Sequence, residues 1–175
     1  METNIYNNDN LTDEEVDTIT TRVKVFLLNS NNEILIGTTN DGCIQLPGGH
    51  QEADEDLNNT IIREIKEETG ITISPIDIKE PFFAKKYYVR NYKNSGINRL
   101  SQIYYYLIRT NQTYDSINIH LTEHEKSNGF RILSISLNDL EKKLLDTAQN
   151  NSIEINRVIA NETNTALHVL LDSLK

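Results

Sequence analysis

Hydrophobic and polar positions alternate early in the chain in the pattern of β-strands. Apolar and β-branched residues dominate residues 22–28 and 33–36, and the polar stretch Asn29-Ser-Asn-Asn32 separates them. Two such segments joined by a short polar turn predict a hairpin. A short strand is also expected at residues 43–46, and it ends at Pro47-Gly48-Gly49 because proline and glycine interrupt regular structure.

The chain before this hairpin carries little of that pattern. Residues 1–10 are mostly polar, and we expect residues 1–18 to form a loose N-terminal segment. One short helical turn is expected within it, because Thr12 and Glu15 have the spacing of a capping box.

The pattern changes to that of a helix between residues 55 and 69. Leu57, Ile61 and Ile65 recur at four-residue spacing, which places them on one apolar face. Gly70 follows at the position where a left-handed residue commonly ends a helix. The sequence therefore predicts a helix over residues 55–69.

Strands are predicted again after this helix. Residues 82–92 and 100–109 are rich in aromatic residues and flank the turn sequence Asn94-Ser-Gly96, and a further strand is expected at residues 130–135. A mixed sheet that includes all of these strands needs helices on both of its faces.

The tail has the apolar spacing of two amphipathic helices. They are expected over residues 137–148 and 155–174, with a break in the second helix near Asn161. We therefore expect a single α/β domain, with residues 19–140 as its main body and residues 141–175 as C-terminal helices packed on it. The tail helices either cap the sheet or pair two subunits into a homodimer.

Composition and charge restrict the class of partner. The net charge of −9 repels polyanions, so we expect no nucleic acid polymer as partner, whereas a small anionic substrate remains compatible. No apolar run approaches the roughly 20 residues of a membrane helix, and the N-terminus lacks the pattern of a secretory signal. Cys43 cannot form an internal disulfide because it is the single cysteine. We expect a cytoplasmic protein that does not bind membranes.

Three glutamates are the first candidates for chemistry. Glu64, Glu67 and Glu68 lie at i, i+3 and i+4 and so share one helix face. Like charges one turn apart destabilise a helix, and its C-terminal end disfavours negative charge. A bound cation would explain this arrangement, and oxygen ligands without histidine or cysteine favour Mg²⁺ or Mn²⁺. The alternative is a solvated acidic face.

Residues 49–71 read GHQEADEDLNNTIIREIKEETGI and resemble the signature of the Nudix family, G-x5-E-x7-R-E-U-x-E-E-x-G-U, where U is a bulky aliphatic residue. A chance match has a probability on the order of one in ten million. Every fixed position is filled, by Gly49, Glu55, Arg63, Glu64, Ile65, Glu67, Glu68, Gly70 and Ile71. The resemblance implies a Nudix-type α/β/α sandwich around a mixed sheet. It also implies a Mg²⁺-dependent pyrophosphohydrolase acting on a nucleoside diphosphate linked to another moiety, an NTP-like or dinucleoside polyphosphate-like substrate.

The same resemblance implies roles for individual residues. Glu64 and Glu68 would be the principal metal ligands, with Glu67 close by and the Gly48 carbonyl as a backbone ligand. Arg63 would hold the carboxylates through charge-assisted hydrogen bonds. The remaining roles implied are those of Glu55 at the loop-to-helix junction, Gly70 at the helix end, and Gly48 and Gly49 where the backbone approaches the phosphates.

The sequence does not decide whether the general base is a carboxylate inside this segment or one outside it. Glu64 is one candidate. Glu125 lies where a contributing carboxylate commonly occurs in the family, and Glu123 is the alternative to it. Acidic residues in such a loop can also be merely solvated.

The aromatic hairpin supplies candidates for substrate binding. Between Pro81 and Tyr114 the chain has no Asp or Glu, but it has six of the seventeen Lys and Arg residues and seven of the eight tyrosines. Cationic and aromatic side chains can pair with phosphates and stack on a base. The candidates for substrate contact are Gly49, Lys85, Lys86, Tyr88 and Arg90. The alternative is that these tyrosines follow from strand propensity and face the core.

Two other functions fit the same signature. The first is a nucleotide-sensing Nudix domain without catalysis, although the carboxylates are intact and only 35 residues follow Leu140, which is short for an added DNA-binding module. The second is an isoprenoid diphosphate isomerase on the same fold, which needs cysteine and histidine chemistry that the chain does not group together. The sequence leaves the substrate and the attacked phosphorus open.

Overall fold

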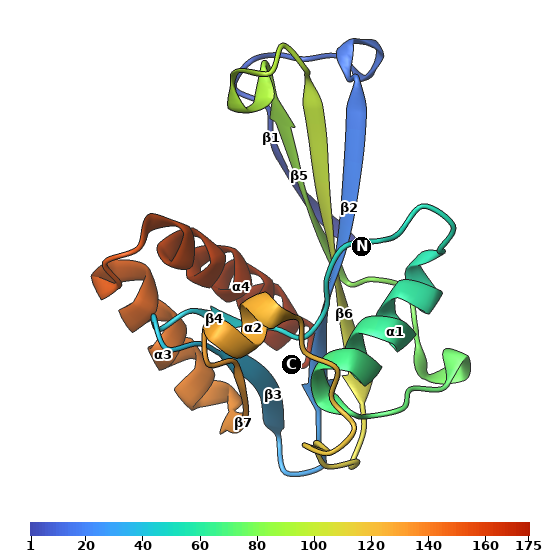
Figure 1. Ribbon diagram of the computed structural model, residues 1–175, viewed down its shortest axis with the longest axis vertical. Coiled ribbons are helices and arrows are strands. Elements are labelled where there is room, and N and C mark those ends of the chain that lie inside the picture. The colour runs from blue at the N-terminus through green and yellow to red at the C-terminus, as the bar shows by residue number, and fades with distance from the viewer.

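A mixed seven-stranded sheet forms the centre of the computed structural model, which covers residues 1–175 and describes all of them except the side chain of His124 (Figure 1). The strands run in the order β1-β5-β6-β2-β3-β4, and β7 pairs with β3. They are β1 (Glu2–Tyr6), β2 (Thr18–Leu28), β3 (Glu33–Thr38), β4 (Ile44–Gln45), β5 (Phe83–Val89), β6 (Arg99–Arg109) and β7 (Arg131–Ser136). The β1–β5 and β2–β6 pairs are parallel and the other pairs are antiparallel.

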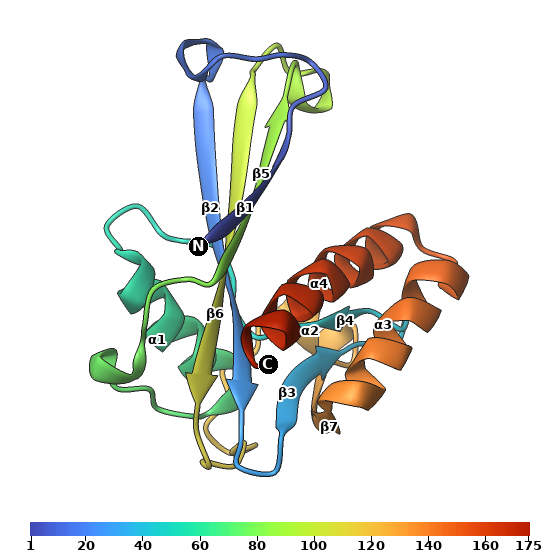
Figure 2. The ribbon, with the colours of Figure 1, turned by 180° about the vertical axis from the view of Figure 1, so that it is seen from behind.

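Helices cover both faces of this sheet, as Figures 1 and 2 show. They are α1 (Leu57–Thr69), α2 (Glu123–Ser127), α3 (Leu137–Asn150) and α4 (Glu154–Ser173). One face packs on α1, and the other packs on α3 and α4. The predicted α/β/α sandwich is confirmed, and the tail helices cap the sheet of their own chain. Among the described residues, the structure has no helix with the length and apolarity that crossing a membrane requires.

Alternation along β2 divides the core into two halves. Val23, Val25 and Leu27 pack against the α1 side, whereas Phe26 and Leu28 pack on the side of α3 and α4. Each of these side chains is at most 2% exposed, and burying such a residue contributes about 1.5–3 kcal/mol. Because side chains alternate along a strand, Arg22 and Lys24 lie on the same face of β2 as Phe26.

Strands β1, β5, β6 and β2 are neighbours in the sheet, and they continue past the helices as an extended blade in the upper part of Figure 1. Its longest pair is β2 with β6, in parallel register from Thr18 opposite Arg99 to Leu28 opposite Arg109. At the far end the Tyr88 hydroxyl donates to Asp13 at 2.7 Å. Arg90 forms an ion pair with Glu15 there at 3.3 Å.

The N-terminal segment differs from the prediction. Residues 1–18 were expected to be loose, but Glu2–Tyr6 forms β1, which pairs in parallel with β5. Tyr6 stacks on Tyr87 with 4.9 Å between ring centroids. The unpaired edge of β5 supplies the hydrogen bonds, and local composition does not reveal a partner that is about eighty residues away. The predicted turn after β1 is confirmed, since the Thr12 amide donates to the Glu15 carboxylate at 2.9 Å.

All three predicted helices are present, and their ends differ from the predicted ones by at most two residues. Helix α1 begins at Leu57 rather than residue 55, because the Asp56 carboxylate caps it by accepting from the Asn59 amide at 2.7 Å. Helix α4 continues through Asn161, so the predicted break is wrong. One asparagine disfavours a helix only weakly, and burial of apolar residues on both sides of it outweighs that preference.

Candidate active site

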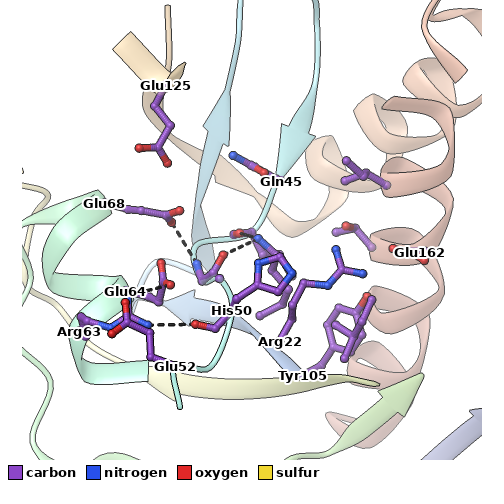
Figure 3. Close-up of a pocket in the computed structure, with 17 residues that line it drawn as sticks. Arg22, Gln45, His50, Glu52, Arg63, Glu64, Glu68, Tyr105, Glu125 and Glu162 are labelled. Atoms are coloured by element: carbon purple, nitrogen blue, oxygen red, sulfur yellow. Dashed lines mark hydrogen bonds and ion pairs between the residues drawn. The ribbon is translucent and has the colours of Figure 1, made fainter. Parts of the chain in front are cut away.

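A cavity of about 400 Å³ opens between α1, the 46–50 loop, β2, β6 and α4 (Figure 3). Glu64 and Glu68 of α1 form one wall, and Glu125 of α2 lies above them. Helix α4 forms the opposite wall with Ile159, Glu162 and Thr163. This cavity brings the signature segment together with the C-terminal helices, whose role the sequence left open.

Arg63 is the centre of an ion-pair network below this wall. Its guanidinium group donates to both carboxylate oxygens of Glu55, at 2.6 and 3.0 Å, and to Glu64 Oε1 at 2.9 Å. It also donates to Glu67 at 3.2 Å and to the His50 carbonyl at 3.0 Å. The hydrogen bond from Arg63 lowers the pKa of Glu55 to about 2. These contacts fix Glu64 and tie the 46–50 loop to α1.

Two glycines allow the loop to lie against the helix. Gly48 has a φ of 125°, and a Cβ there would lie 2.3 Å from the Val23 carbonyl oxygen. A Cβ on Gly49 would lie 2.3 Å from Glu64 Oε1. The Gly48 amide donates to Glu68 Oε2 at 3.0 Å, which holds that carboxylate against the loop.

The two cavity carboxylates are held in an environment that disfavours their charge. Glu68 is 7% exposed, and burial raises its pKa to about 7. Burial also raises the pKa of Glu64, and the hydrogen bond from Arg63 opposes that effect. The negative charges of Glu64 and Glu125 add to the rise in the pKa of Glu68. A cation in the cavity would relieve this repulsion.

Lys24 is a site residue that we did not predict, and its positive charge partly offsets the repulsion between these carboxylates. Its ammonium donates to the carbonyls of Leu46 and Gly48 at 2.9 and 2.6 Å. Burial lowers the pKa of Lys24, and the charges of Glu68 and Glu64 oppose this shift. A signal was present in the sequence, because Lys24 stands between Val23 and Val25 and lies on the same strand face as Phe26, two residues further on.

The four predicted metal ligands differ in their surroundings. Glu64 and Glu68 line the cavity, whereas the Glu67 side chain is 42% exposed and bonded to Arg63. The Gly48 carbonyl accepts from Lys24 at 2.6 Å. Across the described residues, no three histidine, cysteine or acidic side chains lie close enough to enclose an ion. Mg²⁺ usually keeps several waters and uses one or two carboxylates together with substrate phosphates, so Glu64 and Glu68 fit it as a donor pair.

The two candidates from the α2 region differ in position. Glu125 lines the cavity, and one of its oxygens accepts from the Thr122 amide and hydroxyl at 2.7 and 2.8 Å. Glu123 points to solvent with a 92% exposed side chain and pairs with Lys126. Only Glu125 of these two can reach a group bound in the cavity.

The predicted substrate contacts from the aromatic hairpin lie outside the cavity, and of the five candidates only Gly49 lines it. Tyr88 and Arg90 are at the far end of the blade. Lys85 is 3% exposed, and its ammonium lies 5.6 Å from the centroid of the Tyr6 ring. Alternation identifies the face of a strand but not how far along it the helices reach, so the sequence could not separate these residues from the cavity.

Side chains other than the predicted ones line the end of the cavity where we expected the substrate contacts from the hairpin to lie. Arg22 of β2 extends towards α4, with His50 and Tyr105 on either side of it (Figure 3). Within the described part of the chain, neither an ion pair nor a side-chain hydrogen bond engages the Arg22 guanidinium. Gln45 and Glu162 complete this end of the cavity. A cavity with carboxylates at one end and an available guanidinium at the other is suited to a ligand that carries both metal-bound and free phosphate oxygens.

Comparison with known proteins agrees with this geometry. The model of the NUDIX domain matches residues 18–154, so the chain belongs to the Nudix family. The Ap4A hydrolase of C. elegans matches with a TM-score of 0.52 and 16% sequence identity, covering 90% of this chain and 100% of that one. The E. coli ORF135 protein matches with a TM-score of 0.51 and 17% identity, covering 71% and 79%. At these identities the likeness shows the fold alone. No curated protein matches the sequence significantly.

The raised pKa of Glu68 predicts how stability depends on pH in the metal-free protein. The pKa is about 7 in the native state against 4.5 for a free glutamate, so the native state binds more protons between these values. The free energy of unfolding should therefore fall as pH rises from about 4.5 to 7, by on the order of 3 kcal/mol from this group. Glu68→Gln keeps an oxygen for the Gly48 amide and removes the titration.

Urea denaturation in EDTA at several pH values across this window measures the difference between wild type and Glu68→Gln. We expect the advantage of wild type over the variant to shrink with rising pH. A difference that stays constant across the window would show that Glu68 does not titrate in this range.

Proposed function

We propose that this protein hydrolyses a phosphate–phosphate bond in a nucleoside diphosphate linked to another moiety, and that the reaction depends on Mg²⁺ or Mn²⁺. The observation that carries the proposal is the pair Glu64 and Glu68, desolvated on one wall of the cavity and braced by Arg63 and the Gly48 amide. Membership of the Nudix family supports the same reaction class.

Glu64 and Glu68 would hold the ion. When bound, it would neutralise phosphate oxygens and make a coordinated water more acidic. Arg63 keeps Glu64 oriented through a 2.9 Å hydrogen bond, and the Gly48 amide does the same for Glu68 at 3.0 Å. Preorganised carboxylates need little rearrangement when a phosphate arrives, which is the main way a protein assists phosphoryl transfer.

We assign the general base to Glu125. Its carboxylate faces the cavity opposite Glu68, and Thr122 hydrogen-bonds to a single one of its oxygens. The other oxygen can accept a proton from the attacking water. Glu64 is the alternative base, but Arg63 already binds one of its oxygens.

Arg22 would bind the phosphate groups that lie away from the metal. It faces the same cavity as Glu64, and the cavity volume of about 400 Å³ lies within the range of sites for small molecules. Tyr105 and Glu162 lie beside it and could contact the remaining part of the substrate. The net charge of the chain does not prevent binding of an anion, because this cation is placed locally.

A nucleotide-sensing domain without catalysis is the second candidate, because the same cavity could bind a nucleotide and leave it intact. Incubation of the protein with a panel of nucleotides in Mg²⁺ and Mn²⁺ separates the two functions. Metal-dependent release of phosphate products excludes a purely sensory role, and product identity shows which phosphorus is attacked.

Loss of a metal-binding carboxylate should abolish turnover without unfolding the protein. For Glu68→Gln we expect kcat/KM to fall by about 100-fold or more, since charge stabilisation by the metal contributes several kcal/mol. Glu123→Gln is the matched control, because its side chain is 92% exposed and outside the cavity. Wild-type activity in a folded Glu68→Gln variant would remove Glu68 from the site.

Arg22→Gln tests the phosphate contact. Loss of a charge-assisted hydrogen bond of about 1.5–3 kcal/mol should raise KM by about 10- to 100-fold. Arg90→Gln, at the far end of the blade, should leave KM unchanged. If KM rises in Arg90→Gln but not in Arg22→Gln, the aromatic hairpin and not Arg22 binds the substrate.

A further inference from the structure

Lys24 occupies a position surrounded by oxygen atoms of the kind that bind metal ions. Its ammonium donates to two main-chain carbonyls, at 2.9 Å to Leu46 and 2.6 Å to Gly48. The strongest attractive charges on it are those of Glu68 and then Glu64. Carbonyl and carboxylate oxygens are also the ligands of hard divalent cations.

The backbone holds Lys24 firmly in this position. The Val23 amide donates to the Gly49 carbonyl at 3.0 Å, and the Val25 amide donates to the Pro47 carbonyl at 2.9 Å. The loop is therefore paired with β2 on both sides of Lys24. This pairing fixes the main chain around Lys24 and places its side chain beside the loop.

A divalent ion and this ammonium compete for the Gly48 carbonyl. An ion bound to that oxygen would lie about 2.0–2.6 Å from it. The Lys24 ammonium already approaches the same oxygen to 2.6 Å. Two cations at one oxygen repel each other, so the ammonium weakens binding of an ion there.

We infer that Lys24 is a built-in cation that takes the Gly48 carbonyl position of the site and leaves divalent ions the oxygens of Glu64 and Glu68 that face the cavity. The inference rests on the proposed function, because it presumes that these carboxylates bind an ion. It assigns Lys24 a positioning role: it fixes the loop, balances part of the charge of Glu68 and limits how tightly metal binds before the substrate arrives.

Mn²⁺ binding without nucleotide tests this role, measured by calorimetry and by the paramagnetic signal of free Mn²⁺. Lys24→Met keeps the length of the side chain and removes its charge and donors. We expect Lys24→Met to bind Mn²⁺ at least tenfold more tightly than wild type. In Lys24→Met with Glu68→Gln the gain should be smaller, since part of the added affinity comes through Glu68 and the rest through the freed Gly48 carbonyl.

Arg22→Gln is the matched control. It removes a positive charge from the same face of β2, two residues away, but among the described residues the Arg22 side chain forms no hydrogen bond to the loop, unlike that of Lys24. We expect its Mn²⁺ affinity to change by less than threefold. A tenfold gain in Mn²⁺ affinity in Arg22→Gln as well would show that loss of any positive charge near the site has this effect, and it would overturn the inference.

Lys24→Gln serves if Lys24→Met does not fold, because its amide can still donate to the Gly48 carbonyl without charge. A tighter affinity in either folded variant supports the inference, and unchanged or weaker binding overturns it. Failure of the proposed function is a separate result. In that case wild type and every Lys24 variant would bind no Mn²⁺ although all of them are folded.

Discussion

Two carboxylates kept side by side in a desolvated cavity are the constraint on which the site depends. Glu64 and Glu68 repel each other, and burial disfavours the charge of both. The surroundings compensate with Arg63, the Gly48 amide and the Lys24 ammonium. The three compensating groups come from a helix, a loop and a strand, so the charge arrangement ties α1, the 46–50 loop and β2 into one unit.

The rest of the fold places this unit beside a second wall. The long β2–β6 pair carries Arg22 and Tyr105 on the face that α4 covers, and α4 closes the cavity with Ile159 and Glu162. Helix α4 extends from Glu154 to Ser173, almost entirely beyond the residues that match the family model. The end of the cavity where we propose that the substrate binds is therefore built partly from a segment beyond the residues that match the family model.

Local patterns predicted what depends on neighbouring residues. The i, i+3, i+4 spacing identified the acidic face of α1, and the resemblance to the Nudix signature anticipated the contacts of Arg63 with the carboxylates. Spacing could not show that Glu67 lies at the solvent edge of that face, because this depends on where the loop packs. Features that depend on pairing between distant segments were missed for the same reason: strand β1, the cation Lys24, and the distance of Tyr88 and Arg90 from the cavity.

The central claim is that Glu64 and Glu68 hold a divalent ion against substrate phosphates. A crystal structure with Mn²⁺ and a non-hydrolysable nucleotide tests it most directly, since anomalous scattering locates the metal. We expect a Mn²⁺ peak within coordination distance of both carboxylates and a phosphate group beside Arg22. A nucleotide bound in the cavity with no metal at either carboxylate would contradict the account.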